Sequence, residues 1–363
     1  MAFSPGFARR IFFAGMALAL AGFLPGCGDG SSPNSLKFKK TSRYSHQKLV
    51  YDTTSLKLGE LSMLANVDSC LIIFNDDRYL ALSFLDLRDG KVFGFGKADS
   101  MNSSLTMPLR ISPVPGNPKE FEVFDFVKKK IFTYSVDSCR KYLDEVLPSK
   151  AVSVETSALK SLIFNDSTTL SVGLFGGETA FLVSDFEKNV KASFGNYNFN
   201  PEDSNEPMNK ALAYQGLYAV QGDFFVQACK EAPIIQIFSL KDLQNIVPVV
   251  SIEDRYIDYI SRNEEGYASA ISSDNPTAYC DLAVSPEKIY LLYSGKKFSE
   301  FKEHPEKTDQ CGEIHVLDWE GNLLEKMRLD IEVTNIALSP CGSRLYAITL
   351  SPVPALVFFS LSK

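Results

Sequence analysis

The sequence has little of what most metal and catalytic sites are built from. Among its 363 residues are only three histidines, His46, His304 and His315, and one tryptophan, Trp319. The histidines do not have zinc-motif spacing, no Cys-x-x-C pair occurs, and neither a Gly-rich phosphate loop nor a Gly-x-Ser-x-Gly elbow is present. We therefore expect no metal ion and no cofactor, and the common hydrolase and nucleotide-binding motifs are excluded.

An excess of basic residues is also missing. Lysine and arginine number 37 against 44 aspartates and glutamates, which gives a formal net charge of −7. Proteins that bind nucleic acid need a basic footprint to displace counterions from the phosphates, so we expect no nucleic-acid partner. Glycine and proline (22 and 18 residues) are too few for a low-complexity chain, and a hydrophobic content of 45% excludes disorder.

The sequence has no apolar run of bilayer length. The run at its start, residues 11–24, follows Arg9 and Arg10 and has the length of a signal-peptide core. It ends in Leu-Pro-Gly-Cys27, which resembles the bacterial lipobox, whose cysteine is acylated after cleavage. This resemblance implies a signal peptide over 1–26 and lipidation of Cys27. The alternative is an ordinary cleaved signal that happens to precede a cysteine.

Cleavage before Cys27 makes the chain more acidic, because Arg9 and Arg10 are lost and 35 basic residues then face 44 acidic ones. Without a polybasic patch, attachment to a membrane depends on the acyl chains alone. Residues 27–45 begin with a polar, Gly- and Ser-rich stretch, so we expect a lipidated, flexible tether there and a folded domain over 46–363. The expected location is the cell envelope, with the lipid anchor in the outer membrane. The sequence does not decide whether the protein faces the periplasm or the cell exterior.

Six cysteines follow the tether. An even number in an exported chain allows disulfides, but six cysteines permit 15 pairings and the sequence does not select one. Free, buried thiols that pack as small apolar groups are the alternative. The residues concerned are Cys70, Cys139, Cys229, Cys280, Cys311 and Cys341.

A six-residue pattern recurs along the mature chain. Apolar and aromatic residues are followed by Asp or Ser in the fifth place and then by another apolar residue. Four copies run directly into a polar turn, which is typical of a β-hairpin. The copies are LSFLDL (82–87), IFTYSV (131–136), FLVSDF (181–186), IQIFSL (235–240), IHVLDW (314–319) and LVFFSL (356–361).

Two further short strand-like runs precede each copy, and helical periodicity is almost absent. Four short strands in a unit of about 50 residues indicate one blade of a β-propeller, so six copies predict an all-β, six-bladed propeller of four-stranded antiparallel blades. The last unit has only three strands before the chain ends, and the segment 48–54 is expected to supply the fourth and close the ring. The alternative is a row of β-sandwich domains, but no linker-like break in composition occurs between 60 and 363.

Four segments of the mature chain carry a resemblance to a known family: KIYLLYSGKKF (288–298), IHVLDWEGNLLEKMRLD (314–330), SRLYAIT (343–349) and KALAYQG (210–216). They resemble the TolB-like six-bladed propeller lipoproteins of Gram-negative bacteria. This resemblance implies the fold and an envelope location, but no reaction. The segment 95–108 keeps only part of the Gly/Pro/Glu-rich stretch that members usually carry in the first blade.

The long connections of the predicted blades share one face. The segments 97–106, 195–209 and 254–279 join neighbouring blades, and 296–311 joins the second and third strands of one blade. In a propeller these connections lie on the same face, and long loops on a rigid scaffold often carry binding sites. The exception is 137–150, on the other face, whose apolar spacing predicts a short helix.

Aromatic and arginine side chains in these connections suggest a recognition surface for a protein or glycan partner. The alternative is that the aromatic residues only fold the loops onto the ring. Tyr256, Ile257 and Ile260 have helical spacing, which predicts a short amphipathic helix there. The predicted binding residues are Arg255, Tyr256, Tyr259, Arg262, Phe298 and Phe301.

Fifth-place aspartates of the repeat are expected to bind backbone N–H groups of the following turn, and Trp319 to pack between blades. These features favour a non-catalytic, membrane-anchored binding or scaffold protein. The alternative is a calcium-dependent hydrolase with its site in the central channel, by analogy with some six-bladed propellers. Its candidate ligands near the inner strands are Asn66, Asp281, Glu332 and Asn335.

Overall fold

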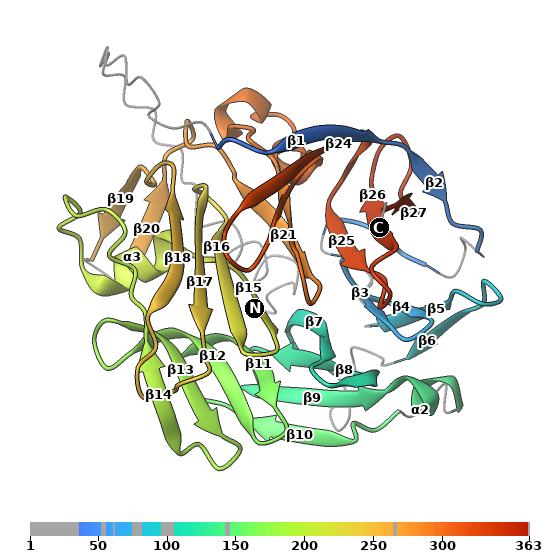
Figure 1. Ribbon diagram of the computed structural model, residues 1–363, viewed down its shortest axis with the longest axis horizontal. Helices are drawn as coiled ribbons and strands as arrows, with labels where there is room; N and C mark the ends of the chain where they lie inside the picture. Colours follow the sequence, from blue (N-terminus) through green and yellow to red (C-terminus); the bar gives the residue numbers. More distant parts are fainter. Residues whose placement is uncertain are drawn as a thin grey trace, which may run out of the picture.

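The computed structural model describes residues 36–51, 56–60, 62–74, 82–95, 105–141, 146–263 and 267–361. Within these ranges six sheets are arranged around a common axis, and successive sheets follow one another around the ring (Figure 1). The six-bladed, all-β propeller with four-stranded antiparallel blades is thereby confirmed. The expected signal peptide 1–26, Cys27 and most of the connection 97–106 lie outside the described residues.

The first three blades each run from an inner strand to an outer strand in chain order. Short turns join most neighbouring strands within these blades, as the polar tetrapeptide 88–91 predicts for the first; the exception among the described connections is 136–149. The strands are β3 (Met63–Val67), β4 (Cys70–Phe74), β5 (Leu82–Asp86) and β6 (Val92–Phe95); β7 (Pro108–Val114), β8 (Asn117–Asp125), β9 (Lys130–Ser135) and β10 (Lys150–Ser153); and β11 (Ala158–Asn165), β12 (Thr168–Phe175), β13 (Thr179–Asp185) and β14 (Val190–Phe194).

The last three blades follow the same order, with a separate two-stranded hairpin between the fourth and fifth. That hairpin is β19 (Tyr259–Arg262) with β20 (Ala268–Ile271). The blade strands are β15 (Gly216–Gln221), β16 (Phe224–Cys229), β17 (Ile234–Ser239) and β18 (Pro248–Glu253); β21 (Tyr279–Val284), β22 (Ile289–Tyr293), β23 (Cys311–Leu317) and β24 (Leu323–Val333); and β25 (Asn335–Leu338), β26 (Arg344–Thr349) and β27 (Ala355–Ser360).

Apolar side chains fill the spaces between neighbouring blades. Phe84 of the first blade packs edge to face against Phe121 of the second blade, with 5.6 Å between the ring centroids. Phe181 of the third blade packs in the same way against Phe225 of the fourth, with 4.9 Å between the centroids. Both faces of a middle strand such as β13 are therefore buried. This explains why the middle strands read as nearly continuous apolar runs instead of alternating with polar residues.

Two N-terminal strands close the ring. β2 (His46–Lys48) pairs antiparallel with β27 and becomes the outer strand of the sixth blade, as expected, although it begins before the predicted segment 48–54. β1 (Lys40–Tyr44) was not anticipated: it lies within the range 27–45 expected to be a tether and adds in parallel to the edge of β24 (Figure 1). Lys40 forms an ion pair of 3.1 Å with Glu325, and the Tyr44 hydroxyl donates to the same carboxylate.

The helices in the described part of the chain are few and short. α2 (Val136–Lys141) lies in the connection after β9 and confirms the short helix predicted in 137–150. α3 (Pro207–Ala213), η2 (Phe298–Phe301) and η3 (Pro305–Asp309) lie in the long connections. Within the described ranges, none of the helices has the length and apolar content needed to cross a membrane.

Candidate functional site

Three long connections lie on one face of the ring. They are 195–215, before β15; 254–278, before β21; and 294–310, between β22 and β23. Each leaves an outer or second strand at the same end of its blade, because the strands alternate in direction. We call these three connections together the loop wall. The fourth predicted connection, 97–106, is described only from residue 105 onward.

The first two connections of the loop wall are joined by side-chain hydrogen bonds. The Tyr259 hydroxyl donates to Asp203 Oδ2 at 2.6 Å, and the Ser269 hydroxyl donates to the backbone carbonyl of Asn209 at 2.7 Å. Burial, and then the hydrogen bond to Asp203, raises the pKa of Tyr259. Helix α3 also contacts β20 directly. The hairpin of β19 and β20 is thus fixed against the connection 195–215, although the whole fourth blade lies between them in the chain.

The second and third connections are joined mainly through the backbone. Thr277 donates its N–H to the carbonyl of Lys296 at 2.9 Å, and Ser299 donates to the carbonyl of Ser273 at 2.8 Å. The Ser299 hydroxyl adds a bond of 2.7 Å to Asp274 Oδ1. Loops that satisfy each other's backbone groups in this way have a defined shape. The loop wall is therefore a continuous structure and not three independent loops.

The helix predicted at Tyr256, Ile257 and Ile260 is wrong, because residues 255–258 have no regular structure and Ile260 lies in the strand β19. Its side chains alternate between two sides: Tyr259 and Ser261 hydrogen-bond to the preceding connection, whereas Ile260 between them is 70% exposed. Alternation with a period of two is the geometry of a strand. The apolar spacing was misleading because Ile260 faces solvent and does not belong to the buried side.

The six predicted binding residues all lie on the loop wall, in two groups. Arg255 and Tyr256 are exposed, Tyr259 is half-buried, and Arg262 ends β19 with a side chain outside the described part of the structure. The second group, Phe298 and Phe301, is half-buried in η2 on the neighbouring connection.

Two exposed apolar side chains add to the first group. Ile260 is 70% exposed and Tyr267 is 55% exposed, on either side of the hairpin turn. Ile260 was missed as a surface residue because its sequence spacing assigned it to a helix face. Ile260 can be identified as a surface residue from its position in a strand between Tyr259 and Ser261, whose side chains point to the other side and form hydrogen bonds. Together with Tyr256, it makes the hairpin the most apolar exposed part of the loop wall among the described residues.

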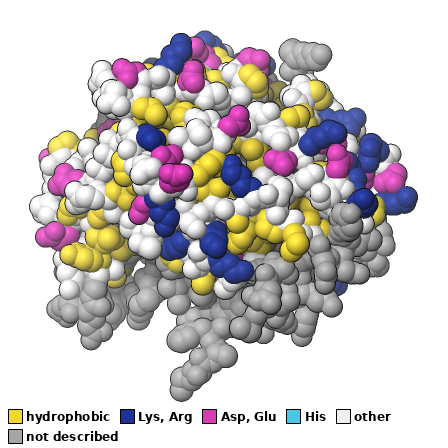
Figure 2. Space-filling view, turned by 90° about the horizontal axis from the view of Figure 1, so that it is seen from below, with side chains coloured by type: hydrophobic (Ala, Val, Ile, Leu, Met, Phe, Trp, Pro, Cys, Tyr) yellow, Lys and Arg dark blue, Asp and Glu magenta, His cyan; other side chains and the backbone are white. Residues whose placement is uncertain are grey.

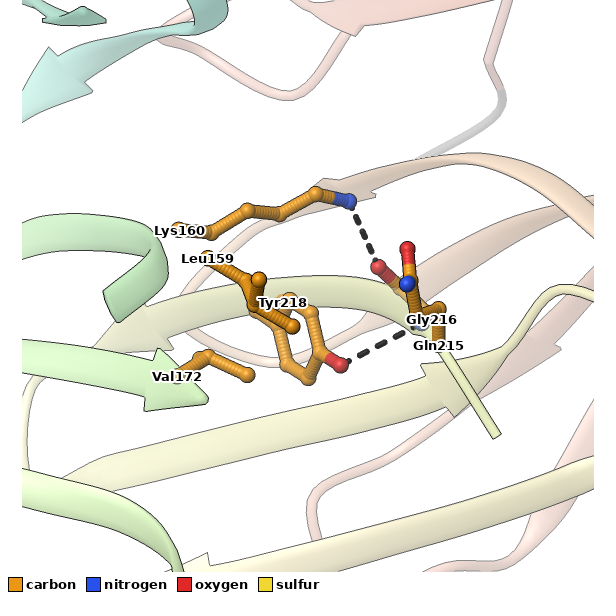
Figure 3. Close-up of a pocket in the computed structure, with 6 residues that line it drawn as sticks. All are labelled: Leu159, Lys160, Val172, Gln215, Gly216 and Tyr218. Atoms are coloured by element: carbon orange, nitrogen blue, oxygen red, sulfur yellow. Dashed lines mark hydrogen bonds between the residues drawn. The ribbon is translucent and has the colours of Figure 1, made fainter. Parts of the chain in front are cut away.

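The central channel is crossed by basic side chains. Arg110 of β7 donates from Nη1 to the carbonyl of Tyr218 at 2.8 Å, and Lys160 of β11 donates to the carbonyl of Gly216 at 2.8 Å (Figure 3). Both acceptors belong to β15, the inner strand of the fourth blade. Burial, followed by the nearby Arg110 and Lys230, lowers the pKa of Lys160 to about 8.

A small cavity lies beside Lys160. It measures about 10 Å³ and is lined by residues of β11, β12 and the start of the fourth blade (Figure 3). A cavity of this size holds about one water molecule, so it does not admit an organic ligand. The lining residues are Leu159, Lys160, Val172, Gln215, Gly216 and Tyr218.

Of the four candidate calcium ligands, all of which the structure describes, only Asp281 and Asn335 meet, through a side-chain hydrogen bond. Asn66 donates to the carbonyl of Cys70 within its own hairpin, and Glu332 forms an ion pair of 2.7 Å with Lys296 at the rim. Asp281 does face the channel, where burial raises its pKa to about 6, but its Oδ2 accepts from the backbone of Ile336 at 2.8 Å.

The charges around Asp281 are also unsuited to a cation. Arg110 and Lys160 both act electrostatically on this carboxylate. A divalent cation next to two basic side chains would be repelled by them. Among the described residues no group of three or more His, Cys, Asp or Glu side chains has metal-binding geometry. The channel residues therefore give no support to the calcium-dependent hydrolase.

The fifth-place aspartates bind their turns as predicted. Asp185 Oδ1 accepts from the backbone N–H groups of Glu187 and Asn189, and Asp318 Oδ1 accepts from that of Asn322 at 2.7 Å. Trp319 is buried between the fourth and fifth blades, where its indole N–H donates to the carbonyl of Ser285 at 3.1 Å. These residues have structural roles, so they do not compete with the loop wall as candidate sites.

Surface charge is mixed on the side of the molecule that Figure 2 shows. Acidic and basic side chains are interspersed there among apolar ones, and neither sign forms a continuous field. The exposed end of the loop wall has both signs as well, with Arg255 next to Asp258.

Comparisons with known proteins agree on the fold. A family model described as TolB-like 6-blade propeller-like matches residues 119–340. Curated protein sequences include no match to the chain.

Two solved structures from Bacteroides are similar to it over most of their length. A protein of Bacteroides fragilis named as an exported protein has a TM-score of 0.56 and 13% identity, covering 88% of this chain and 95% of its own. A member of the DUF4221 family from Bacteroides vulgatus has a TM-score of 0.55 and 10% identity, covering 87% of this chain and 97% of its own. At this identity the likeness shows the fold alone.

Proposed function

The chain belongs to the TolB-like six-bladed propeller family, and from this premise we propose that it is a non-catalytic binding or scaffold lipoprotein of the cell envelope. It is anchored to the outer membrane through acylated Cys27 and binds a protein or glycan partner with its loop wall. The export assigned to the similar Bacteroides fragilis protein and the lipobox-like Leu-Pro-Gly-Cys27 support this location.

The observation that carries the proposal is the mutual bonding of three long connections on one face. A propeller needs only short turns to close its blades, as the tight connection between β15 and β16 illustrates. The loop wall is instead built from the long segments 195–215, 254–278 and 294–310, which hold one another in place. Long ordered loops on a rigid scaffold are usually functional. Exposed Ile260 and Tyr267 supply apolar contact area on this structure.

The N-terminal arm supports a binding surface that faces away from the membrane. β1 begins next to Leu323, whose carbonyl accepts from the N–H of Lys39 at 3.0 Å. Leu323 follows the turn 318–322, which lies on the face opposite the loop wall. The chain that leads to Cys27 therefore joins the ring on the short-turn side, and the loop wall is directed toward the opposite side.

Cross-linking in cells tests this function. Epitope-tagged full-length protein is cross-linked, purified and analysed by mass spectrometry, and the same is done for a double variant, Ile260→Asp with Tyr267→Asp. The matched control is Val247→Asp with Val249→Asp. Val247, just before β18, is 56% exposed and Val249, on β18, is 51% exposed, and both lie away from the hairpin. We expect a dominant partner whose recovery falls at least tenfold in the hairpin variant and is unchanged in the control.

Two results would contradict the proposal. Equal recovery of the partner from the hairpin variant and the control would show that the loop wall is not the binding surface. If Cys27→Ser leaves the protein in the membrane fraction at its normal level, lipidation of this residue is not the anchor. The two results are independent, since the first concerns the loop wall and the second concerns the N-terminus.

A further inference from the structure

Two cysteines lie at the roots of the loop wall. Cys280 is the second residue of β21, directly after the connection 254–278, and Cys311 is the first residue of β23, directly after the connection 294–310. Cys311 belongs to a buried apolar cluster between the fifth and sixth blades, and Cys280 packs against the same cluster. Cys311 is fully buried, whereas Cys280 is partly accessible.

The two thiols meet around Asp309. Cys280 Sγ lies 3.8 Å from Asp309 Oδ1, and Cys311 Sγ lies 3.5 Å from the backbone carbonyl of the same residue. The Cys311 thiol is also the hydrogen-bond partner that, with burial, raises the pKa of Cys280. Both sulfurs therefore lie against the same residue and also interact with each other.

Such proximity of two thiols is unusual when their strands, here β21 and β23, are not neighbours in the sheet. β22 lies between β21 and β23, and two strand spacings place backbones about 10 Å apart, too far for a disulfide. Here both cysteines are at irregular positions: the register shifts between Tyr279 and Asp281 on one strand and between Cys311 and Glu313 on the other. β22 ends at Tyr293, at this same level. Cys280 is the extra residue of the first bulge, and Cys311 borders an irregularity in the pairing of β23 with β24, so neither side chain has to follow the regular spacing of the sheet.

We propose that Cys280 and Cys311 form a disulfide once the chain is exported, and that this bond staples the roots of two segments of the loop wall, 254–278 and 294–310. Two thiols lose two protons and two electrons, and one S–S bond forms. The electrons pass to a protein disulfide of the exporting compartment, which is reduced to a dithiol. The inference depends on the export that the proposed function includes.

The exposures indicate the order of the steps. Cys280, the accessible thiol, attacks the oxidant as a thiolate and forms a mixed disulfide with it, releasing one thiol of the oxidant. Cys311 then attacks Cys280 Sγ and displaces the second. Because the neighbouring thiol and burial raise the pKa of Cys280, we expect oxidation to be slow at neutral pH and to accelerate as pH rises.

The bond would make the loop wall more rigid. It closes the segment 280–311, which contains the whole connection 294–310. It also fixes the end of the hairpin connection to the end of this segment. A binding surface held in its bound shape loses less conformational entropy when the partner docks. The oxidised protein is therefore the form in which the loop wall is ready to bind.

Thiol trapping of the full-length protein tests the inference. Envelope fractions are quenched in acid, alkylated, digested and mapped by mass spectrometry. Purified Cys341→Ser protein, which lacks the exposed thiol, is oxidised in parallel with glutathione disulfide. We expect one peptide pair, Cys280 with Cys311, and a melting temperature roughly 5 °C higher for the oxidised than for the reduced protein.

An internal control is available in the first two blades. Cys70 and Cys139 are also buried in one cluster, but Arg140 Nη2 lies 3.0 Å from Cys70 Sγ and occupies it. This pair should remain reduced under the same conditions. Single variants Cys280→Ser and Cys311→Ser should each abolish the difference in melting temperature between oxidising and reducing buffers.

The outcomes separate this inference from the proposed function. Free Cys280 and Cys311 in exported protein, together with no cross-link in glutathione disulfide, would overturn the disulfide while leaving the loop wall as a binding surface. Protein found only in the cytoplasm would overturn the envelope location instead. The purified protein would still report on the disulfide in that case, because glutathione disulfide supplies the oxidant.

Discussion

Asp86 is expected to contribute more to stability than its equivalent in another blade, Asp318. Both are fifth-place aspartates of the repeat, and both accept backbone N–H groups of their own turn, from Arg88 at 3.0 Å and from Asn322 at 2.7 Å. Asp86 is also buried and lies 3.2 Å from Arg140, which belongs to helix α2 of the neighbouring blade. Asp318 bonds only to Asn322 in its own turn among the contacts described.

The two contributions can be separated by magnitude. Loss of the turn bonds in Asp318→Ala should lower the free energy of unfolding by about 1 kcal/mol, as for a lost helix cap. Asp86→Ala loses the same bonds and an ion pair with the exposed side chain of Arg88, which contributes little because it is in water, and it also leaves Arg140 without its buried partner. Removal of one member of a buried ion pair costs about 3 to 5 kcal/mol. Arg140 is partly exposed and keeps its ion pair with Asp137 at 3.2 Å, so we expect the loss of its contact with Asp86 to cost only about 2 kcal/mol. The total for Asp86→Ala is then about 3 kcal/mol.

Urea unfolding of both variants measures this difference, and acid provides a second readout. The side chain of Arg88 is the main cause that lowers the pKa of Asp86 to about 2, below its ordinary value of 3.8. The stability that Asp86 contributes is therefore present above pH 4 and lost as pH falls toward 2. Equal free energies of unfolding for the two variants would refute the reasoning, since the contact between blades would then contribute nothing.

Two further predictions concern the ring. Gly216→Ala should prevent folding or lower the free energy of unfolding by several kcal/mol, since its Cβ would overlap the backbone carbonyl oxygen of Ala228. Circular dichroism and urea unfolding test this, and Gly222→Ala, with open space around the Cβ, is the milder control despite its positive φ. Burial lowers the pKa of His315 below 6.5, although Glu313 opposes this, so the stability contributed by its neutral form should be present above pH 6.5 and decline as pH falls through the lowered pKa. Unfolding at pH 7.5 and 5.5 should show that decline in the wild type and a smaller one in His315→Gln; an equal decline in both would contradict it.

Much of the ring could be predicted because its information is local. The apolar run, the fifth-place aspartate and the turn follow one another closely in the chain, so they identify each hairpin without any knowledge of its neighbours. The short helix α2 was likewise visible in local spacing. The position of Trp319 between blades followed from its place in the repeat.

The candidate site depended on contacts between distant segments, and there local patterns failed. The spacing of Tyr256 and Ile260 suggested a helix, yet Ile260 lies in the strand β19, whose neighbouring side chains hydrogen-bond to the connection before the fourth blade. The polar stretch before residue 46 suggested a tether, yet the open edge of β24, near the other end of the chain, pairs with β1.

By itself, the sequence determined the number of blades, the turn-binding aspartates and the face on which the long connections lie, because each of these follows from strand order and from residues near one another in the chain. Only the tertiary structure decided that three of those connections form one loop wall, that β1 extends the fifth blade, and that Cys280 meets Cys311. The physical reason is that the ring brings together segments whose pairing depends on blade curvature, strand bulges and unsatisfied edges, none of which is encoded in a local pattern.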